Sequence, residues 1–182
     1  MAFNVSDMKS QLTGGGARPS LFEVQITNPI NGIADFKIPF MVKAASLPAS
    51  TISAIEVPYF GRKIKFSGDR EFEDWEVTVI NDEDFAVRNA MEEWLNAMNT
   101  HVGNIRVAGN LNPETYKAQA QVRQYSKTGA MLREYSFYGL FPTAVAAIDL
   151  NWDPAGAIEE FGVTFSYDWW EVTGGLTGVS TS

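Results

Sequence analysis

The residue types that most often perform catalysis or bind metals are rare in this sequence. It contains one histidine, His101, and no cysteine. An imidazole in a catalytic triad or a metal site needs partners such as a second histidine or a thiolate. His101 lies in a polar stretch after a predicted helix, so we expect a solvated loop histidine. The lack of cysteine excludes disulfides and thiolate chemistry, and it suits a chain made in a reducing cytoplasm.

Acidic side chains form three groups that would be candidates for acid–base work or cation binding. Asp82–Asp84 precede a predicted helix, where the helix dipole stabilises negative charge. Asp149 and Asp153 lack the spacing of an EF-hand loop. Glu159 and Glu160 are neighbours in a predicted strand, so they point to opposite faces. The sequence therefore predicts no enzyme and no catalytic, cofactor-binding or metal-binding residue. The enzymatic alternative is a carboxylate pair assembled across strands.

Two short segments resemble motifs that contact phosphates. Gly14–Gly16 has no strand before it and no Gly-Lys-Ser/Thr ending, so it is predicted to be a flexible arm and not a phosphate loop. Arg62–Lys65 is basic and has Tyr59, Phe60 and Phe66 around it. This cluster has three interpretations: a nucleic-acid patch, a solvated hairpin whose charges discourage edge pairing, or a surface that pairs with acidic residues of a neighbouring copy.

The negative charge of the chain is unevenly placed. The formal net charge is -8, of which residues 1–80 contribute -1 and residues 81–182 contribute -7. Phosphates dominate the affinity of proteins for nucleic acid, so an acidic chain is a poor candidate for gripping it. The same charge suits a surface from which polyanions slide away.

Alternating apolar and polar residues dominate the sequence and predict a mainly β fold, an antiparallel barrel or sandwich. In Phe161–Trp169 every second residue is large and apolar, as in a strand with one buried face. Further strands are expected at residues 21–27, 36–44, 53–60, 62–66, 75–79, 117–125, 131–138 and 141–150.

One amphipathic helix is predicted at the side of the barrel. It begins after the capping residues Asn81–Asp84, and its apolar residues are spaced to form one stripe. The stripe contains Val87, Met91, Trp94, Leu95 and Met98. We expect Trp75, Trp94, Phe161 and Phe165 to be packing residues, since each lies on the apolar side of an amphipathic element.

The chain is predicted to be one domain with two arms. Residues 1–20 and 172–182 are expected to be flexible because they are rich in glycine and hydroxyl residues, and residues 21–171 form the β domain. Lys43–Arg70 is long for a simple connection, which predicts a projecting hairpin that reaches a neighbouring copy.

Several blocks of sequence, in the same order along the chain, resemble one known family. They are ARPSLFEV (17–24), KAASLPA (43–49), RKI (62–64), SGDREFEDW (67–75), VTVINDE (77–83), VRQY (122–125), GLFPT (139–143), DLNWD (149–153), IEEF (158–161) and YDWWE (167–171). The sequence is similar to the tail tube family of T4-like contractile-tailed bacteriophages. The glycine-rich N-terminal arm and the tail beyond Glu171 depart from the family.

The resemblance implies a structural β-barrel subunit that forms hexameric rings stacked head to tail inside a contractile sheath. The inner strands of the six copies would join into one channel, through which viral DNA passes without specific binding. The implied partners are further copies of the chain, the tail sheath protein, and the baseplate and tail terminator proteins. No cofactor and no membrane insertion by the chain itself are implied, and the location is the virion tail after assembly in the host cytoplasm.

Contacts between subunits and rings are expected to involve the segment Lys43–Arg70. The predicted interface residues are Leu47, Pro48, Arg62, Lys63, Lys65, Asp69 and Arg70. The channel wall is expected to be acidic or near-neutral, because each phosphate neutralised by a basic wall would add affinity. Lys117–Tyr125 and Phe141–Leu150 are the predicted wall strands.

Two other functions remain open at this stage. One is a tube subunit of a related contractile injection or type VI secretion system. The other is a carbohydrate-binding β module with an exposed aromatic platform. That platform would contain Tyr59, Phe60, Trp152, Trp169 and Trp170.

Overall fold

In the computed structural model, residues 5–107, 109, 111–152 and 156–179 are described, and they form nine strands and several short helices. The elements in chain order are α1 (Val5–Gln11), η1 (Thr13–Gly15), β1 (Phe22–Ile26), η2 (Gly32–Ala34), α2 (Ile38–Met41), β2 (Val42–Ala45), β3 (Ser50–Tyr59), β4 (Arg62–Phe72), β5 (Trp75–Ile80), α3 (Ala86–Met98), α4 (Pro113–Tyr116), β6 (Ala118–Tyr125), β7 (Met131–Val145), β8 (Glu160–Ser166) and β9 (Trp169–Gly174). All strand pairs are antiparallel, so the predicted mainly β, antiparallel class is confirmed.

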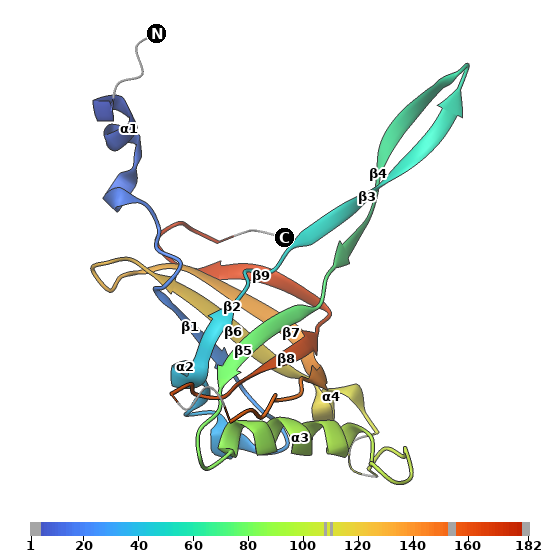
Figure 1. The fold of residues 1–182 in the computed structure, drawn as a ribbon. Helices are drawn as coiled ribbons and strands as arrows, with labels where there is room; N and C mark the ends of the chain where they lie inside the picture. The colour runs from blue at the N-terminus through green and yellow to red at the C-terminus, as the bar shows by residue number, and fades with distance from the viewer. Residues whose placement is uncertain (1–4, 108, 110, 153–155, 180–182) are drawn as a thin grey trace.

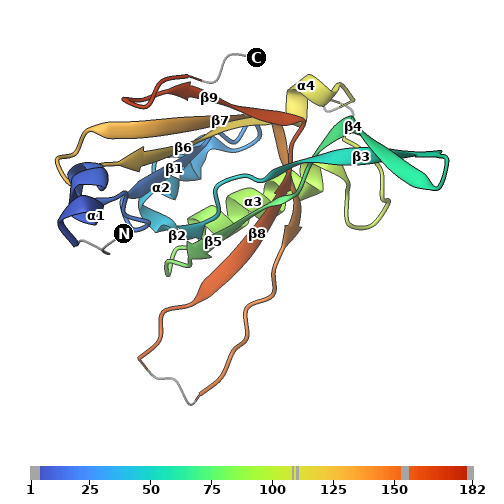
Figure 2. The same cartoon turned by 90° about the horizontal axis from the view of Figure 1, so that it is seen from above.

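A single long strand, β7, joins two sheets into a curled, incomplete barrel (Figures 1 and 2). Its first part pairs with β6 and β9, and β6 pairs with β1; we call these four strands sheet I. Its last part pairs with β8, which continues through β5 to β2; we call these sheet II. The strands at the two ends of this order, β1 and β2, come into contact, but among the described residues they are not paired.

The core lies between the two sheets and is closed at one end by α3. Trp75 of sheet II stacks on Phe137 of sheet I with ring centroids 4.4 Å apart. Trp94 of α3 is fully buried, and its indole N–H donates to the carbonyl of Tyr116 at 2.8 Å. Phe161 and Phe165 of β8 are buried as well. The four aromatic residues expected to pack in the core therefore do so.

The predicted helix is confirmed as α3, which buries Val87, Met91 and Trp94 and exposes Glu92 and Glu93. Its start differs from the prediction. The residue before the helix, Phe85, has a left-handed backbone (φ 52) and caps no N–H with its side chain. Asp84 instead accepts a hydrogen bond from the backbone N–H of Ala86 at 3.1 Å.

Several of the predicted strands are wrong in extent; the strand expected at residues 62–66 continues to Phe72. Residues 36–44 are a strand only from Val42; before it, Ile38–Met41 form the helix α2, whose first turn accommodates Pro39 because proline lacks only an N–H that has no partner there. Phe161–Trp169 is interrupted after Ser166, and the chain crosses from sheet II to sheet I.

The strand predicted at Phe141–Leu150 is the end of β7, which passes from one sheet to the other and stops at Val145. Gly139 lies at this crossing with φ 67, a conformation that side chains disfavour. A Cβ there would lie 2.0 Å from the carboxylate of Asp168, so only glycine fits.

The segment between β2 and β5 forms the predicted projecting hairpin, β3–β4, which extends away from the body (Figure 1). Tyr59 pairs with Arg62, and Phe60 and Gly61 form the turn with φ of 44 and 78. Positive φ at both turn residues is typical of the type I′ turn that matches strand twist.

The ends of the chain hold more secondary structure than the sequence indicates. The predicted N-terminal arm contains the exposed helix α1, and β9 extends to Gly174 with Val172 buried, three residues into the predicted tail. Among the described residues, no helix has the length and apolarity needed to cross a membrane.

We predict that Trp94→Ala lowers the free energy of unfolding by about 3–5 kcal/mol, because it leaves a cavity in the core. Trp152 provides the control, since its side chain is 99% exposed. Trp152→Ala should change the stability by no more than about 0.5 kcal/mol. Urea unfolding of both variants measures the difference, and a loss well below 1 kcal/mol for Trp94→Ala would contradict the packing assigned here.

Candidate functional site

The face of sheet I that points away from the core is mainly polar on all four strands, although Trp169 of β9 also lies on it and stacks on Tyr138. Side chains alternate between the two faces along a strand. One residue of each strand that points into the core is Val24, Val122, Phe137 or Val172, so the residues directly before and after each of them point to the opposite face. The residues of this polar face are Glu23 and Gln25 on β1, Gln121, Arg123 and Tyr125 on β6, Glu134, Ser136 and Tyr138 on β7, and Glu171 and Thr173 on β9.

The strand register aligns these residues in rows across the sheet. Glu23 pairs with Arg123, and Arg123 pairs with Glu134, so the cation lies between two carboxylates. In the next row Gln121 lies between Gln25 and Ser136. Opposite charges on directly opposed residues stabilise a sheet, whereas like charges would destabilise it.

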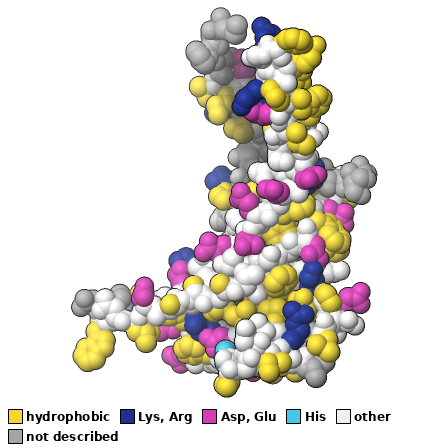
Figure 3. All heavy atoms as spheres, turned by 90° about the vertical axis from the view of Figure 1, so that its right-hand side faces the viewer, with side chains coloured by type: hydrophobic (Ala, Val, Ile, Leu, Met, Phe, Trp, Pro, Cys, Tyr) yellow, Lys and Arg dark blue, Asp and Glu magenta, His cyan; other side chains and the backbone are white. Residues whose placement is uncertain are grey.

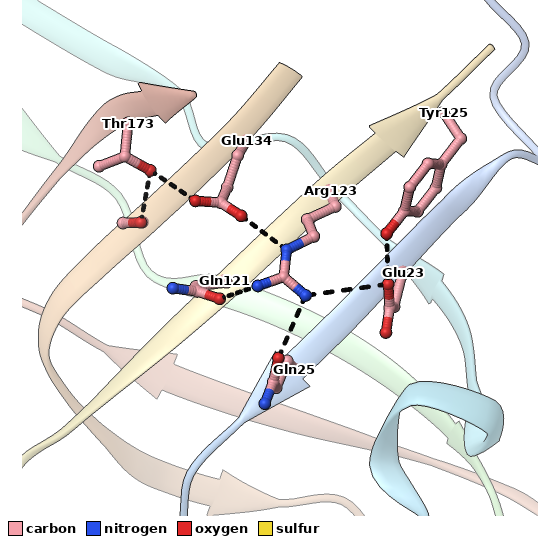
Figure 4. A network of polar contacts seen from close by, with 8 residues as sticks. Glu23, Gln25, Gln121, Arg123, Tyr125, Glu134 and Thr173 are labelled. Carbon is pink, nitrogen blue, oxygen red and sulfur yellow. Dashed lines mark hydrogen bonds and ion pairs between the residues drawn. The ribbon is translucent and has the colours of Figure 1, made fainter. Parts of the chain in front are cut away.

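Arg123 is the centre of a hydrogen-bond network that connects the strands (Figure 4). Its Nε donates to Glu134 at 2.6 Å, and its two terminal nitrogens donate to Gln121 at 2.5 Å and Gln25 at 3.3 Å. The carboxylate of Glu23 lies 4.0 Å away. The hydrogen bond to Arg123 lowers the pKa of Glu134, and the same bond raises the pKa of Arg123.

The carboxylates of this face are held by further hydrogen bonds. Tyr125 donates to Glu23 at 2.6 Å, Tyr138 donates to Glu171 at 2.8 Å, and Thr173 donates to Glu134 at 2.9 Å. These bonds raise the pKa of both tyrosine hydroxyls, because each hydroxyl would lose its proton next to a negative charge. The charged side chains are therefore fixed in place against the sheet.

Sheet I has two open edges, β1 and β9. Within the described residues, neither strand pairs with another strand on its outer side. Neighbouring strands in the sheet are antiparallel, so after four strands β1 and β9 run in opposite directions. If a second copy is rotated about an axis along the strands, its β1 would therefore run antiparallel to β9 of the first copy.

The projecting hairpin has one apolar face and one charged face. Ile55 pairs with Phe66 and Val57 with Ile64, and all four side chains are at least 44% exposed. Figure 3 shows hydrophobic side chains gathered along one side of the hairpin, which stands at the top of that view. On the opposite face, Glu56 pairs with Lys65 in register.

The predicted interface residues lie at two ends of this hairpin. Arg62, Lys63 and Lys65 are near its tip, whereas Asp69 and Arg70 are near its base. Eight residues of strand separate Arg62 from Arg70, or about 26 Å at 3.3 Å per residue. These residues therefore do not form one cluster.

The remaining two interface residues, Leu47 and Pro48, lie between β2 and the hairpin. Leu47 lines a cavity of about 150 Å³ with Pro19, Phe22 and Val122. Their role in contacts between copies stays a prediction.

Two of the predicted basic residues already have partners within the chain. The ammonium groups of Lys63 and Lys65 lie 2.6 and 3.6 Å from the carboxylate of Glu56. Arg62 and Arg70 have no ion pair among the described residues. Glu56 was not predicted from the sequence as part of the interface, although its place opposite the basic cluster follows from folding the two strands about Phe60–Gly61.

Several of the candidate catalytic carboxylates are held by ion pairs or hydrogen bonds within the chain, and Asp149, Glu159 and Glu160 line one cavity of about 360 Å³. Lys37 forms ion pairs with Asp82, at 3.1 Å, and with Asp84. Glu159 accepts a hydrogen bond from Asn81 at 2.9 Å, and Glu160 pairs with Lys43 at 2.5 Å. Asp153 lies outside the described residues.

The described residues contain no group of three acidic or histidine side chains that could hold a metal. His101 is exposed in a turn, as expected.

The aromatic residues proposed as a carbohydrate platform are dispersed over the molecule. Tyr59 and Phe60 are at the tip of the hairpin, and Trp152 lies in the connection between β7 and β8. Trp169 stacks on Tyr138 of β7, at 5.3 Å between ring centroids. A shared platform is therefore not formed.

Comparisons with known sequences identify the family. A sequence profile described as phage tail tube protein matches residues 17–173. The chain is 38% identical over 160 residues to tail tube protein gp19 of Enterobacteria phage T4, which covers 87% of this chain and 93% of that protein. The tail tube protein of Serratia phage KSP90 is 24% identical over 120 residues, 66% of each chain.

Solved structures share the fold at lower identity. The tube-terminating cap of the anti-feeding prophage matches with a TM-score of 0.65 at 18% identity, over 95% of this chain and 99% of that chain. A chain of the sheath–tube complex of the extracellular contractile injection system PVC, in its extended state, matches with a TM-score of 0.59 at 12% identity, over 94% and 99%. Together with the sequence relatives, these observations lead to one conclusion: the chain belongs to the phage tail tube protein family.

Proposed function

We propose that six copies of this chain form a ring by pairing β9 of each copy with β1 of the next, so that the polar faces of sheet I line a common channel. The arrangement of sheet I supports this ring most directly. One face of the sheet packs in the core, the opposite face is polar, and both edge strands are unpaired on their outer side among the described residues. The even number of strands keeps every junction antiparallel. Backbone N–H and C=O groups at the edges would then gain partners in the assembly.

Rings stack head to tail through the projecting hairpin in this proposal. Repeating one head-to-tail contact produces an open filament, which is what a tube requires. The apolar face of the hairpin is exposed in the single chain, and such a patch is typical of a protein–protein contact. The tube is a part of the virion, with the contractile sheath outside it and the baseplate and tail terminator at its ends.

The channel conducts viral DNA without binding it specifically, and the chain is a structural subunit without catalytic activity. The polar face carries three carboxylates, Glu23, Glu134 and Glu171, and one guanidinium, that of Arg123. This excess of negative charge repels phosphates over a Debye length of about 10 Å at 0.1 M salt. In this proposal the wall consists of the predicted strand Lys117–Tyr125, β1, the first part of β7 and β9, whereas the other predicted wall strand, Phe141–Leu150, begins in sheet II and is not part of it. The net negative charge of this face agrees with the acidic or near-neutral wall expected from the sequence.

A tube subunit of a contractile injection system is the second candidate, since solved structures from two such systems share the fold. The higher sequence identity to tail tube proteins of phages favours the phage tail.

We predict that the purified protein forms rings or tubes, either alone at high concentration or after addition of a baseplate complex as nucleus. Obligate interfaces typically bury about 2,000 Å² or more, so assembly should be stable once nucleated. Cryo-electron microscopy should show sixfold rings with sheet I lining the channel. A protein that stays strictly monomeric at high concentration, even with the nucleating complex, would contradict the proposal.

We predict that removal of the hairpin abolishes stacking but not folding. Deleting residues 53–69 and joining Ile52 to Arg70 through Asn-Gly keeps a two-residue turn of the preferred type. The shortened chain should unfold cooperatively, because the hairpin contributes no buried residue to the core. Electron microscopy should show no tubes; tubes of normal length and stability would refute the role of the hairpin.

Matched double variants then distinguish the two faces of the hairpin. Ile64→Ser with Phe66→Ser alters the apolar face and should block stacking. Lys63→Ser with Lys65→Ser alters the opposite face by the same number of residues. Because Glu56 already pairs with both lysines, we expect this second variant to stack, with a dependence on salt that differs from the wild type.

A further inference from the structure

Among the described residues, Arg123 is the one basic residue whose side chain lies on the polar face of sheet I. Arg133 is the other arginine on these strands, but it has the parity of the core-facing Phe137, and its guanidinium lies over the ring of Tyr135 at 5.3 Å. Lys117 precedes β6 and is paired with Asp168 at 2.7 Å. A phosphate that approaches the middle of this face therefore meets a single positively charged ligand.

An unpaired arginine at this place would hold DNA. The guanidinium group is planar and forms two parallel hydrogen bonds with phosphate, which makes it the strongest phosphate-binding side chain. In a ring of identical copies the same group would occur once per copy at one height of the channel. Each phosphate neutralised in this way adds affinity through release of counterions.

The sheet nevertheless requires a cation at this position. Glu23 and Glu134 lie on either side of Arg123 in the same row, and without it two carboxylates would face each other across one strand. Arg123 also connects β6 to β1 and β7 through its hydrogen bonds. The chain thus contains a group that stabilises sheet I and would also attract the DNA that the channel conducts.

We infer that Glu134, assisted by Glu23, prevents Arg123 from binding the phosphates of DNA in the channel. The inference rests on the proposed function, because it requires that the polar face of sheet I lines the channel. Glu134 occupies Nε of the guanidinium at 2.6 Å, while Gln121 and Gln25 occupy its terminal nitrogens. Glu134 is itself fixed by Thr173, so it does not swing away to release the arginine. The local pairing, in addition to the net charge of the face, keeps the wall from retaining DNA.

The test is the variant Glu134→Gln, which keeps the shape of the side chain and removes its charge. Assembled tubes of the wild type and the variant are titrated into a short fluorescent duplex DNA, and binding is followed by anisotropy over a range of salt concentrations. We expect no measurable binding by the wild type at physiological salt. The variant should bind, and the slope of log K against log salt concentration should be about -0.9 for every phosphate engaged.

Glu171→Gln is the matched control. It removes the same unit of charge from the same face but leaves the pair of Arg123 and Glu134 intact, since Glu171 is held by Tyr138. It should bind DNA no better than the wild type. The double variant Arg123→Gln with Glu134→Gln should lose the binding that Glu134→Gln gains.

Two results would overturn the inference: no gain of DNA binding in Glu134→Gln tubes, or an equal gain in Glu171→Gln tubes, which would assign the effect to net charge alone. If Glu134→Gln fails to assemble, Glu23→Gln applies the same test from the other side of Arg123, with a smaller expected gain because Glu23 lies 4.0 Å away. Cryo-electron microscopy of the same tubes distinguishes a failure of the proposed function from a failure of the inference about Glu134. A channel lined by another surface refutes the proposed function, whereas Glu134→Gln tubes whose channel is lined by sheet I but which do not bind DNA refute only the inference.

Discussion

The unpaired outer edges of β1 and β9 are the constraint on which the rest of the architecture depends. A backbone N–H or C=O group must find a partner, and an exposed edge strand invites another strand to supply it. Within the described chain, sheet I has no strand that covers either edge. Many proteins protect an edge by closing the barrel, but here β1 and β2 meet without pairing, and β9 stands beside β7 alone. In the proposed ring the same edges become the means of assembly.

The two faces of sheet I follow from this constraint. A sheet that continues from one copy to the next divides space into two sides, so each strand must alternate strictly between them. Val122 and Arg123 illustrate the requirement: one is 2% exposed in the core, and the next residue along the strand is the centre of the polar network. A shift of the register by one residue would exchange the two faces and break both the core and the wall.

Sequence reasoning found the elements whose pattern is local. The alternation of Val163 and Phe165 and the stripe of Val87, Met91 and Trp94 specify a strand and a helix without reference to any other part of the chain. The predictions were wrong where contacts between distant parts of the chain determine the secondary structure. Residues 36–44 alternate as a strand does, yet Ile38 turns into the core on the helix α2. The alternation around Tyr167 continues through a change of sheet, which is fixed by the hydrogen bond from the N–H of Asp168 to the carbonyl of Tyr138 at 2.9 Å.

The polar network was beyond the reach of the sequence for a similar reason. Gln25 and Arg123 are 98 residues apart in the chain, and only the register of β1 against β6 brings them to one place. The sequence feature that indicates the network is the position of the polar residues, which alternate with the buried residues along each strand. In both β1 and β6 the residues out of phase with the buried valines are charged residues, amides or, at Tyr125, a tyrosine, so the two strands could have been recognised as sharing a polar face. Which of these residues pair with one another could not be predicted from the sequence.

The low sequence identity of the structural relatives is consistent with a fold that depends on alternating apolar and polar residues more than on particular side chains. A chain of an anti-feeding prophage keeps the fold at 18% identity, because an edge-paired sheet requires apolar and polar residues in alternation and not particular side chains. The pair of Arg123 and Glu134 is a different kind of feature. It depends on two specific groups whose charges offset each other at a distance of 2.6 Å, so a change of either group alone leaves the charge of the other without this partner. The fold thus tolerates broad substitution along its strands, while the proposed passage of DNA places a narrow requirement on one row of the wall.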